Sequence, residues 1–193
     1  MPALARLLDT DLNTLLSFQD DLSEKEVALF MNEVSETMDK DGFEAGYLLA
    51  TEKLKEYPTC DLLVSNLAML LDGALMLHGS KNKSNEMYRE KIESLYYRAA
   101  QSEDATIREQ AQACLISKLM GKQDYEQAQE ILNTLPKTSP VDREQAQANI
   151  YIAQGDLEKA AKLIEEKLLS ATNEIHAALM TLMEIALKEE RMD

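Results

Sequence analysis

Three stretches of this 193-residue chain repeat one pattern, DGFEAGYLLATEKLKEYP, QDYEQAQEILNTLP and GDLEKAAKLIEEKLL. In each stretch a large residue follows an acidic or glycine-containing turn, a small residue comes three positions later, and an apolar residue comes four positions after that. The large residues are Phe43, Tyr125 and Leu157, the small ones Gly46, Ala128 and Ala160, and the third ones Ala50, Leu132 and Ile164. A small residue lets two helices approach closely, and the large one fills the gap beside it. The repetition predicts helix pairs in series.

Apolar residues follow a helical period in the rest of the chain as well. Ser23, with Glu26 three residues later, has the sequence of a capping box and begins a helix expected over about 23–40. The buried face of this helix is expected to carry Val27, Phe30, Met31, Val34 and Met38. Gly42 ends it, and a second helix is expected to run to residues 55–56 before Pro58.

The segment CDLLVSNLAMLLDGALMLHG is apolar on nearly every side, which predicts a helix enclosed by its neighbours at the centre of the core. A polar loop is expected at 79–85. The further helices are expected at about 84–101, 104–120, 123–135, 142–154, 156–170 and 173–190. No segment alternates apolar and polar residues for long enough to predict a strand, so the expected fold class is all-α.

The charge of the chain excludes several classes of partner. Its 35 acidic and 20 basic side chains give a net charge of −15, and no basic run is free of acids. Nucleic-acid binding needs basic side chains that neutralise phosphates, so we expect no unaided DNA binding and no membrane partner. Cys60 and Cys114 are too far apart in the sequence for a zinc-ligand motif, and the chain has no apolar run of 18 residues. We expect a cytoplasmic protein with both cysteines reduced.

The repeated stretches resemble the second helix of a tetratricopeptide repeat, whose pattern is G-D-Y-x-x-A-x-x-x-(Y/F)…P. Pro58 lies where that repeat places its proline after Phe43. The interval from Tyr125 to Leu157 is close to one such repeat, whereas the longer interval from Phe43 to Tyr125 needs a divergent pair, expected over 60–102. The resemblance implies a tetratricopeptide-like stack of antiparallel helix pairs, an α-solenoid, over 21–193. A final helix would cap this stack with one stripe of residues, namely Ile175, Ala178, Leu179, Leu182 and Ala186.

The first residues, PALARLLDTDLNTLLSF, are similar to the closing segment of the lambda-repressor-like (Xre-family) helix-turn-helix domain. In that family LARLL belongs to the fourth helix, and D-x-D-x-L-L leads into the fifth. Residues 1–20 are therefore expected to be the remnant of such a domain. Its first three helices, including the one that enters the major groove, have no counterpart in this sequence, so no DNA-contacting residue carries over. Removal of those helices and a gene that begins internally are both open explanations.

Bacterial regulators of this family often continue into a tetratricopeptide-like C-terminal region. The two resemblances together imply the regulatory region of an Xre-type transcriptional regulator, which senses a partner or peptide or associates with itself. Such a region would bind DNA only through an upstream helix-turn-helix domain. The alternative is a stand-alone scaffold for protein–protein interaction with no link to transcription.

Catalysis has little support in the sequence. His78 and His176 belong to no HExxH motif or triad-like cluster, and Glu174 and His176 point to different sides of a helix because they are two residues apart. No phosphate-binding glycine motif is present. We expect no enzymatic activity, no cofactor and no metal.

A peptide or protein partner is instead expected on the concave face of the stack, with a homodimer as the other form of association. In the register of the family, the methionines of the first helices turn toward that face, although filling the core is an equally good explanation for them. An acidic-tail clamp is not expected, because its lysine places hold Gln145 and Asp142 in one pair, and Ser65 and Leu62 in another. The surface suits a neutral, apolar or basic peptide. The candidate groove residues are Met31, Ser35, Met38, Ser65, Met69, Ser117, Met120, Gln145 and Asn149.

Overall fold

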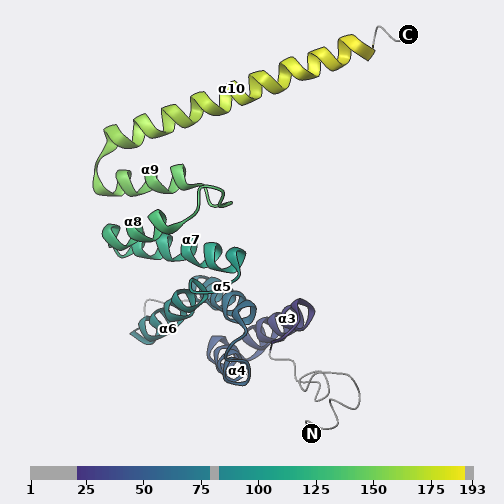
Figure 1. Cartoon of the computed structure of the whole chain (residues 1–193). Coiled ribbons are helices and arrows are strands. Elements are labelled where there is room, and N and C mark those ends of the chain that lie inside the picture. Colours follow the sequence, from purple (N-terminus) through teal and green to yellow (C-terminus); the bar gives the residue numbers. More distant parts are fainter. Residues whose placement is uncertain (1–20, 79–82, 190–193) are drawn as a thin grey trace, which may run out of the picture. The chain divides into compact units, whose positions relative to one another are not determined.

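The computed structural model describes residues 21–78 and 83–189, and the remnant predicted over 1–20 lies outside them (Figure 1). The described residues form helices and no strand, which confirms the all-α prediction. The helices are α3 (Glu24–Asp41), α4 (Phe43–Glu56), α5 (Asp61–His78), α6 (Lys83–Ala99), α7 (Ala105–Gly121), α8 (Tyr125–Thr134), α9 (Arg143–Gln154) and α10 (Leu157–Glu189). The chain divides within α7 into two compact units, one ending at Gln112 and the other beginning at Ala113.

The first unit begins with the predicted capping box. The backbone N–H of Ser23 donates to the Glu26 carboxylate at 2.9 Å, and the N–H of Glu26 donates to the Ser23 hydroxyl at 3.3 Å. Two of the N–H groups that a helix leaves unpaired at its start are satisfied in this way. Gly42 ends α3 with a φ of 91°, a conformation that strongly favours glycine, and α4 starts at the next residue.

Helix α5 lies at the centre of the first unit, as its apolar sequence predicts. It packs against α3, α4 and α6 (Figure 1). Five of its apolar side chains have no exposed surface, namely Leu63, Val64, Leu67, Ala68 and Leu71. Cys60, just before α5, is also buried, whereas Cys114 in α7 is only half-buried.

The second unit is built around one apolar cluster from the end of α7, from α8 and from α9. Its members are Ile116, Leu119, Ala128, Leu132, Leu135 and Ile150. Asp124 and Asp142 cap α8 and α9 by accepting hydrogen bonds from backbone N–H groups three residues later. Gly155 ends α9 in the left-handed conformation, with a φ of 82°, so that α10 can begin two residues later and pack against α9.

One helix boundary differs from the prediction. The sequence predicted separate helices at 156–170 and 173–190, but α10 runs without interruption from Leu157 to Glu189. The segment between them, SATN, contains neither glycine nor proline, and the Thr172 hydroxyl donates to the carbonyl of Leu168 at 2.8 Å. A threonine that bonds one turn back in this way is accommodated within a helix instead of capping a new one. No described helix has the length and apolar character that crossing a membrane requires.

Candidate interaction surfaces

The three repeated stretches occupy equivalent positions in the structure. Their large residues are the first residues of α4, α8 and α10. Their small residues, Gly46, Ala128 and Ala160, are all buried. A Cβ atom at Gly46 would overlap Cγ of Met38 and lie 3.1 Å from the carbonyl oxygen of Val34, both in α3. The absence of a side chain therefore sets how closely α4 approaches α3.

The large residues of the repeat do not share one role. Phe43 packs edge-on against Tyr88 of α6, with ring centroids 5.1 Å apart, and Tyr125 packs against the apolar cluster of the second unit. Leu157 is 64% exposed, so the prediction that it fills the gap between two helices is wrong. The turn before α10 has only two residues, Gly155 and Asp156.

An aromatic cluster between α4 and α6 was not predicted. Tyr47 and Tyr88 meet at 4.7 Å between ring centroids, and the Tyr88 hydroxyl donates to the Glu44 carboxylate at 3.2 Å. Burial raises the pKa of Tyr88, and the hydrogen bond to Glu44 raises it further because it favours the protonated hydroxyl. Tyr47 lies on α4 and Tyr88 on α6, and no sequence motif links the two positions. Only the packing of the helices brings the rings together.

The candidate groove residues of the first unit fall into two groups. Met38 and Ser65 are buried, with exposed fractions of 6% and 3%, so their assignment to an open groove surface is wrong. The side chain of Met38 lies against Gly46 and occupies the space that a Cβ atom at this position would take. Met31 and Ser35 are half-buried and Met69 is exposed.

The candidate groove residues of the second unit are more accessible. Ser117, Gln145 and Asn149 are exposed, and the Gln145 amide donates to the Asn149 side-chain oxygen at 3.3 Å along α9. Met120 is half-buried and packs against the apolar cluster. The polar residues thus present amide and hydroxyl groups at the surface, while Met120 also supports the core.

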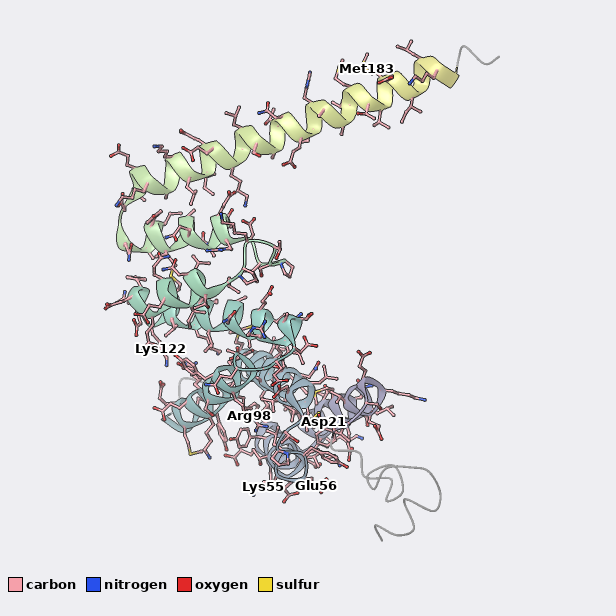
Figure 2. The ribbon with its side chains drawn as sticks, in the orientation of Figure 1. Asp21, Lys55, Glu56, Arg98, Lys122 and Met183 are labelled. Carbon is pink, nitrogen blue, oxygen red and sulfur yellow. The ribbon has the colours of Figure 1, made fainter. Side chains whose placement is uncertain are left out.

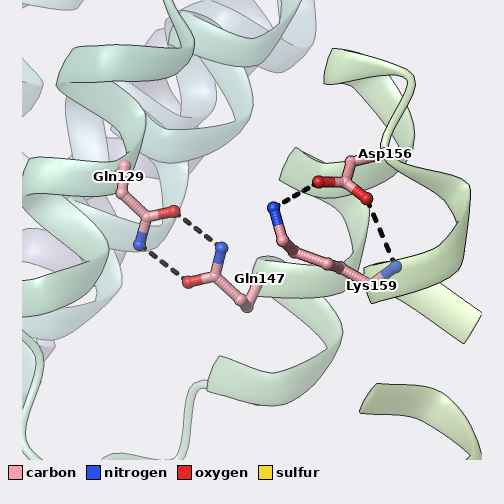
Figure 3. Close-up of polar contacts among 4 residues, drawn as sticks. All are labelled: Gln129, Gln147, Asp156 and Lys159. Carbon is pink, nitrogen blue, oxygen red and sulfur yellow. Dashed lines mark hydrogen bonds and ion pairs between the residues drawn. The ribbon is translucent and has the colours of Figure 1, made fainter. Parts of the chain in front are cut away.

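Polar side chains connect α8 to α9 across their interface. The amides of Gln129 and Gln147 form two reciprocal hydrogen bonds of 2.7 and 2.6 Å (Figure 3). Each amide both donates and accepts, so the pair satisfies two partly buried groups at once. This pair fixes the rotation of α9 relative to α8.

Two aspartates tie the turns of the second unit to α10. Lys159 forms an ion pair with Asp156 at 2.5 Å (Figure 3), and its hydrogen bond lowers the pKa of Asp156. Lys167 forms an ion pair with Asp142, and this hydrogen bond, followed by that from the Gln145 backbone, lowers the pKa of Asp142. Both carboxylates are therefore held in their charged form.

Beyond Lys167, α10 has no neighbour among the described residues. Every side chain described from Leu168 to Lys188 is exposed, and many of these side chains are large and apolar, such as Met183 (Figure 2). We call the exposed face of this helix the α10 stripe; it consists of Leu168, Leu169, Ile175, Leu179, Leu182 and Met183, which are between 54% and 66% exposed.

The prediction that this face caps the stack is wrong for most of α10. Helix α9 has 12 residues and α10 has 33, which correspond to lengths of roughly 18 and 50 Å. An antiparallel neighbour so short covers only about the first three turns of α10. The helical spacing of the stripe was visible in the sequence, but its exposure depends on the length of the neighbouring helix.

Comparisons with models of known protein families, with curated proteins and with solved structures found no match for this chain. Among the described residues, no group of three or more histidine, cysteine, aspartate or glutamate side chains is arranged to hold a metal ion. The surfaces that the described residues present are therefore those of an all-α helical stack with polar amide groups on α9 and the apolar stripe on α10.

Proposed function

We propose that this chain is the cytoplasmic regulatory region of a bacterial Xre-type DNA-binding transcriptional regulator. It would sense a peptide or protein partner and associate with a second copy, without holding DNA itself. Two DNA-binding heads must match half-sites about one helical turn apart. Partner binding that changed the arrangement of two copies would therefore change DNA binding.

The observation that carries this proposal is the burial of Gly46, Ala128 and Ala160 at the same position of three helices. This is the position at which the tetratricopeptide repeat uses a small residue to bring its two helices together. Repeat proteins of this kind stack helix pairs and bind partners along their surfaces. The similarity of residues 1–20 to the end of a helix-turn-helix domain supports the link to transcription.

The chemistry of the expected ligand follows from the surface. The chain carries a net charge of −15, which repels an acidic peptide. The exposed Ser117, Gln145 and Asn149 offer hydroxyl and amide groups that bond a peptide backbone without requiring a charge. A neutral, apolar or basic peptide is the class that fits.

Titration of the purified chain into labelled peptides of these three classes, read by fluorescence anisotropy, tests the sensing role. We expect at least one class to bind, and Asn149→Ala to weaken that binding at least tenfold. Asn32→Ala is the matched control, because Asn32 is an exposed asparagine on α3 and belongs to no candidate groove. If no class binds, or if the two variants behave alike, the sensing role is wrong.

The link to DNA has a separate test in the native gene. The proposal expects the reading frame upstream of Met1 to encode the first helices of a helix-turn-helix domain. A full-length protein with those helices should shift a DNA fragment that carries its operator, whereas the present chain should not. Unrelated upstream sequence would overturn the regulator assignment and favour a stand-alone interaction scaffold.

A further inference from the structure

The α10 stripe continues a face that is already used for packing. At the start of α10, Ala160 is buried and Ile164 half-buried against α9. Steps of three and four residues along the helix lead from these residues to Ala171, Ile175, Ala178 and Leu182. One apolar face therefore runs along α10, covered in its first turns and uncovered in the rest.

The uncovered part is as large as a stable interface. A leucine-sized side chain that is more than half exposed presents on the order of 100 Å² of accessible surface. The six residues of the stripe, together with the exposed Ala171, Ala178 and Ala186 beside them, therefore present on the order of 800 Å². The largest apolar patch on a typical monomer is about 300–600 Å², and a standard interface buries about 800 Å² from each partner.

The charge distribution points to a second copy as the occupant. The chain as a whole carries a charge of −15, so most of its surface repels another copy. From Leu168 to Leu187, however, the only acids are Glu174 and Glu184, and helical spacing places both outside the stripe. Glu184 is also paired with Lys188 at 2.7 Å. This face can meet itself without bringing like charges together.

The order of side chains within the stripe is self-complementary in an antiparallel pair. If a two-fold axis crosses the stripe at the level of residue 177 along the helix, Leu168 of one copy faces Ala186 of the other, Leu182 faces Thr172, and Ile175 faces Leu179. Large side chains then meet small ones at both ends. The Thr172 hydroxyl is bonded to its own helix, so its methyl group can face the partner. A parallel pair would set Ala186 against Ala186 and leave a void.

We propose that a second copy of this chain covers the α10 stripe, in a symmetric dimer whose two α10 helices pack antiparallel. A two-fold dimer is the arrangement in which one patch can meet itself. The inference rests on the association role proposed above and names the surface that serves it.

Sedimentation or light scattering of the purified chain tests this inference. We expect a mass about twice the 21.7 kDa of one chain at micromolar concentration. Leu179→Glu should raise the dimer dissociation constant at least tenfold, because it buries a charge at the centre of the interface. Leu29→Glu is the matched control: Leu29 is 60% exposed on α3, outside the stripe, and the dimer should persist. Helical content, measured by circular dichroism, shows that both variants remain folded.

The antiparallel orientation has its own test. In a chain that carries Leu168→Cys and Ala186→Cys together, mild oxidation should link position 168 of one copy to position 186 of the other, as mapped by mass spectrometry. A parallel pair would instead link position 168 to position 168, and this result would overturn the antiparallel arrangement.

A strict monomer at all concentrations, or a dimer that Leu179→Glu leaves intact, overturns the proposed interface. Peptide binding by such a chain would leave the sensing role standing. Conversely, a dimer that Leu179→Glu dissociates, in a chain that binds no peptide, would support the interface and remove the sensing role. The two proposals therefore fail separately.

Discussion

Helices α5 and α10 are both rich in leucine, methionine and alanine, yet these side chains are mostly buried or half-buried in α5 and mostly exposed in α10. Leu63, Leu67 and Leu71 of α5 have no exposed surface, whereas Leu168 and Leu182 of α10 are more than 60% exposed. Leucine content alone does not explain the difference, because both helices contain many leucines. Helix α5 has three neighbours, α3, α4 and α6, and α10 packs against α9 alone among the described elements.

The lengths of paired helices account for this contrast. Helices α5 and α6 pack against each other and have 18 and 17 residues, so their lengths match closely. Helices α9 and α10 have 12 and 33 residues. An apolar residue becomes core only where another element reaches it, and α9 ends long before α10 does.

Replacement of a covered leucine should have the largest effect on stability. Leu67→Ala in α5 removes a fully buried side chain and leaves a cavity, which should lower the free energy of unfolding by about 2–5 kcal/mol. Urea unfolding followed by circular dichroism measures this loss. The same change in the uncovered helix, Leu179→Ala, should cost less than about 0.5 kcal/mol at a concentration where the chain is monomeric.

Equal losses of unfolding free energy for Leu67→Ala and Leu179→Ala under those conditions would contradict the difference in burial between α5 and α10. Equal losses would mean that Leu179 is covered within one copy of the chain. A loss for Leu179→Ala that grows with protein concentration would instead place Leu179 in an interface between copies, because only such an interface depends on concentration.

A smaller loss of stability is expected at Gly46, where α4 lies close against α3. Gly46→Ala introduces a Cβ that overlaps Cγ of Met38, which is buried and close to its own backbone, so the neighbour cannot simply swing away. Overpacking of this kind should cost about 1–3 kcal/mol, read from the same urea unfolding curves.

Gly73→Ala is the control for this substitution. Gly73 lies within α5 but is exposed, and a Cβ there would meet nothing within 4 Å. Alanine is the better helix former, so this variant should gain about 0.5–1 kcal/mol. A loss of stability at Gly73 comparable to that at Gly46 would contradict close packing as the cause at Gly46, because a Cβ at Gly73 meets no neighbour.

Much of the fold was predictable because it depends on local chemistry. The Ser23–Glu26 capping box, the break at Gly42 and the starts of α4 and α8 all follow from residues within a few positions of each boundary. The core position of α5 was also predictable, since a helix that is apolar on all sides has to be enclosed.

The surfaces were less predictable because they depend on what lies opposite. Helical spacing placed Ile175, Leu179 and Leu182 of the α10 stripe on one face but gave no sign that α9 is too short to cover them. Met38 and Ser65 were assigned to a groove from their place in a repeat, yet both are buried. The pairing of Gln129 with Gln147 depends on the relative rotation of two helices, which neither local sequence specifies.

The amide pair of Gln129 and Gln147, which joins α8 to α9, should make an intermediate contribution to the free energy of unfolding. Gln147→Ala removes both hydrogen bonds across the interface from the partly buried Gln129 amide, which keeps only its bond to Asn133 at 3.1 Å, and it should lower the free energy of unfolding by about 1 kcal/mol. Gln154→Ala, at an exposed position at the end of α9, should change it by less than about 0.5 kcal/mol. Equal effects on urea unfolding would contradict a role for the pair in fixing α9.

The smallest effect on the free energy of unfolding is expected for the ion pair of Lys167, the residue at which the part of α10 covered by α9 ends. Lys167 is half-buried and pairs with Asp142, and every described residue after it is exposed. Asp142→Asn retains an N-cap side chain for α9 but removes the ion pair, which should cost a few tenths of a kcal/mol (~0.3) at neutral pH because the pair is largely solvent-exposed.

The pH dependence separates this ion pair from the cap. The hydrogen bond from Lys167, followed by that from the Gln145 backbone, lowers the pKa of Asp142 in the folded chain. A lowered pKa stabilises the fold above the carboxyl's ordinary value, and that stabilisation is lost as the pH falls through the folded value. Urea unfolding should therefore show the full difference between Asp142→Asn and the unaltered chain well above the ordinary carboxyl pKa of 3.8, and a shrinking difference as the pH falls below it. A difference that stays constant over this range would place the contribution of Asp142 in its geometry at the start of α9, and not in its ion pair with Lys167 of α10.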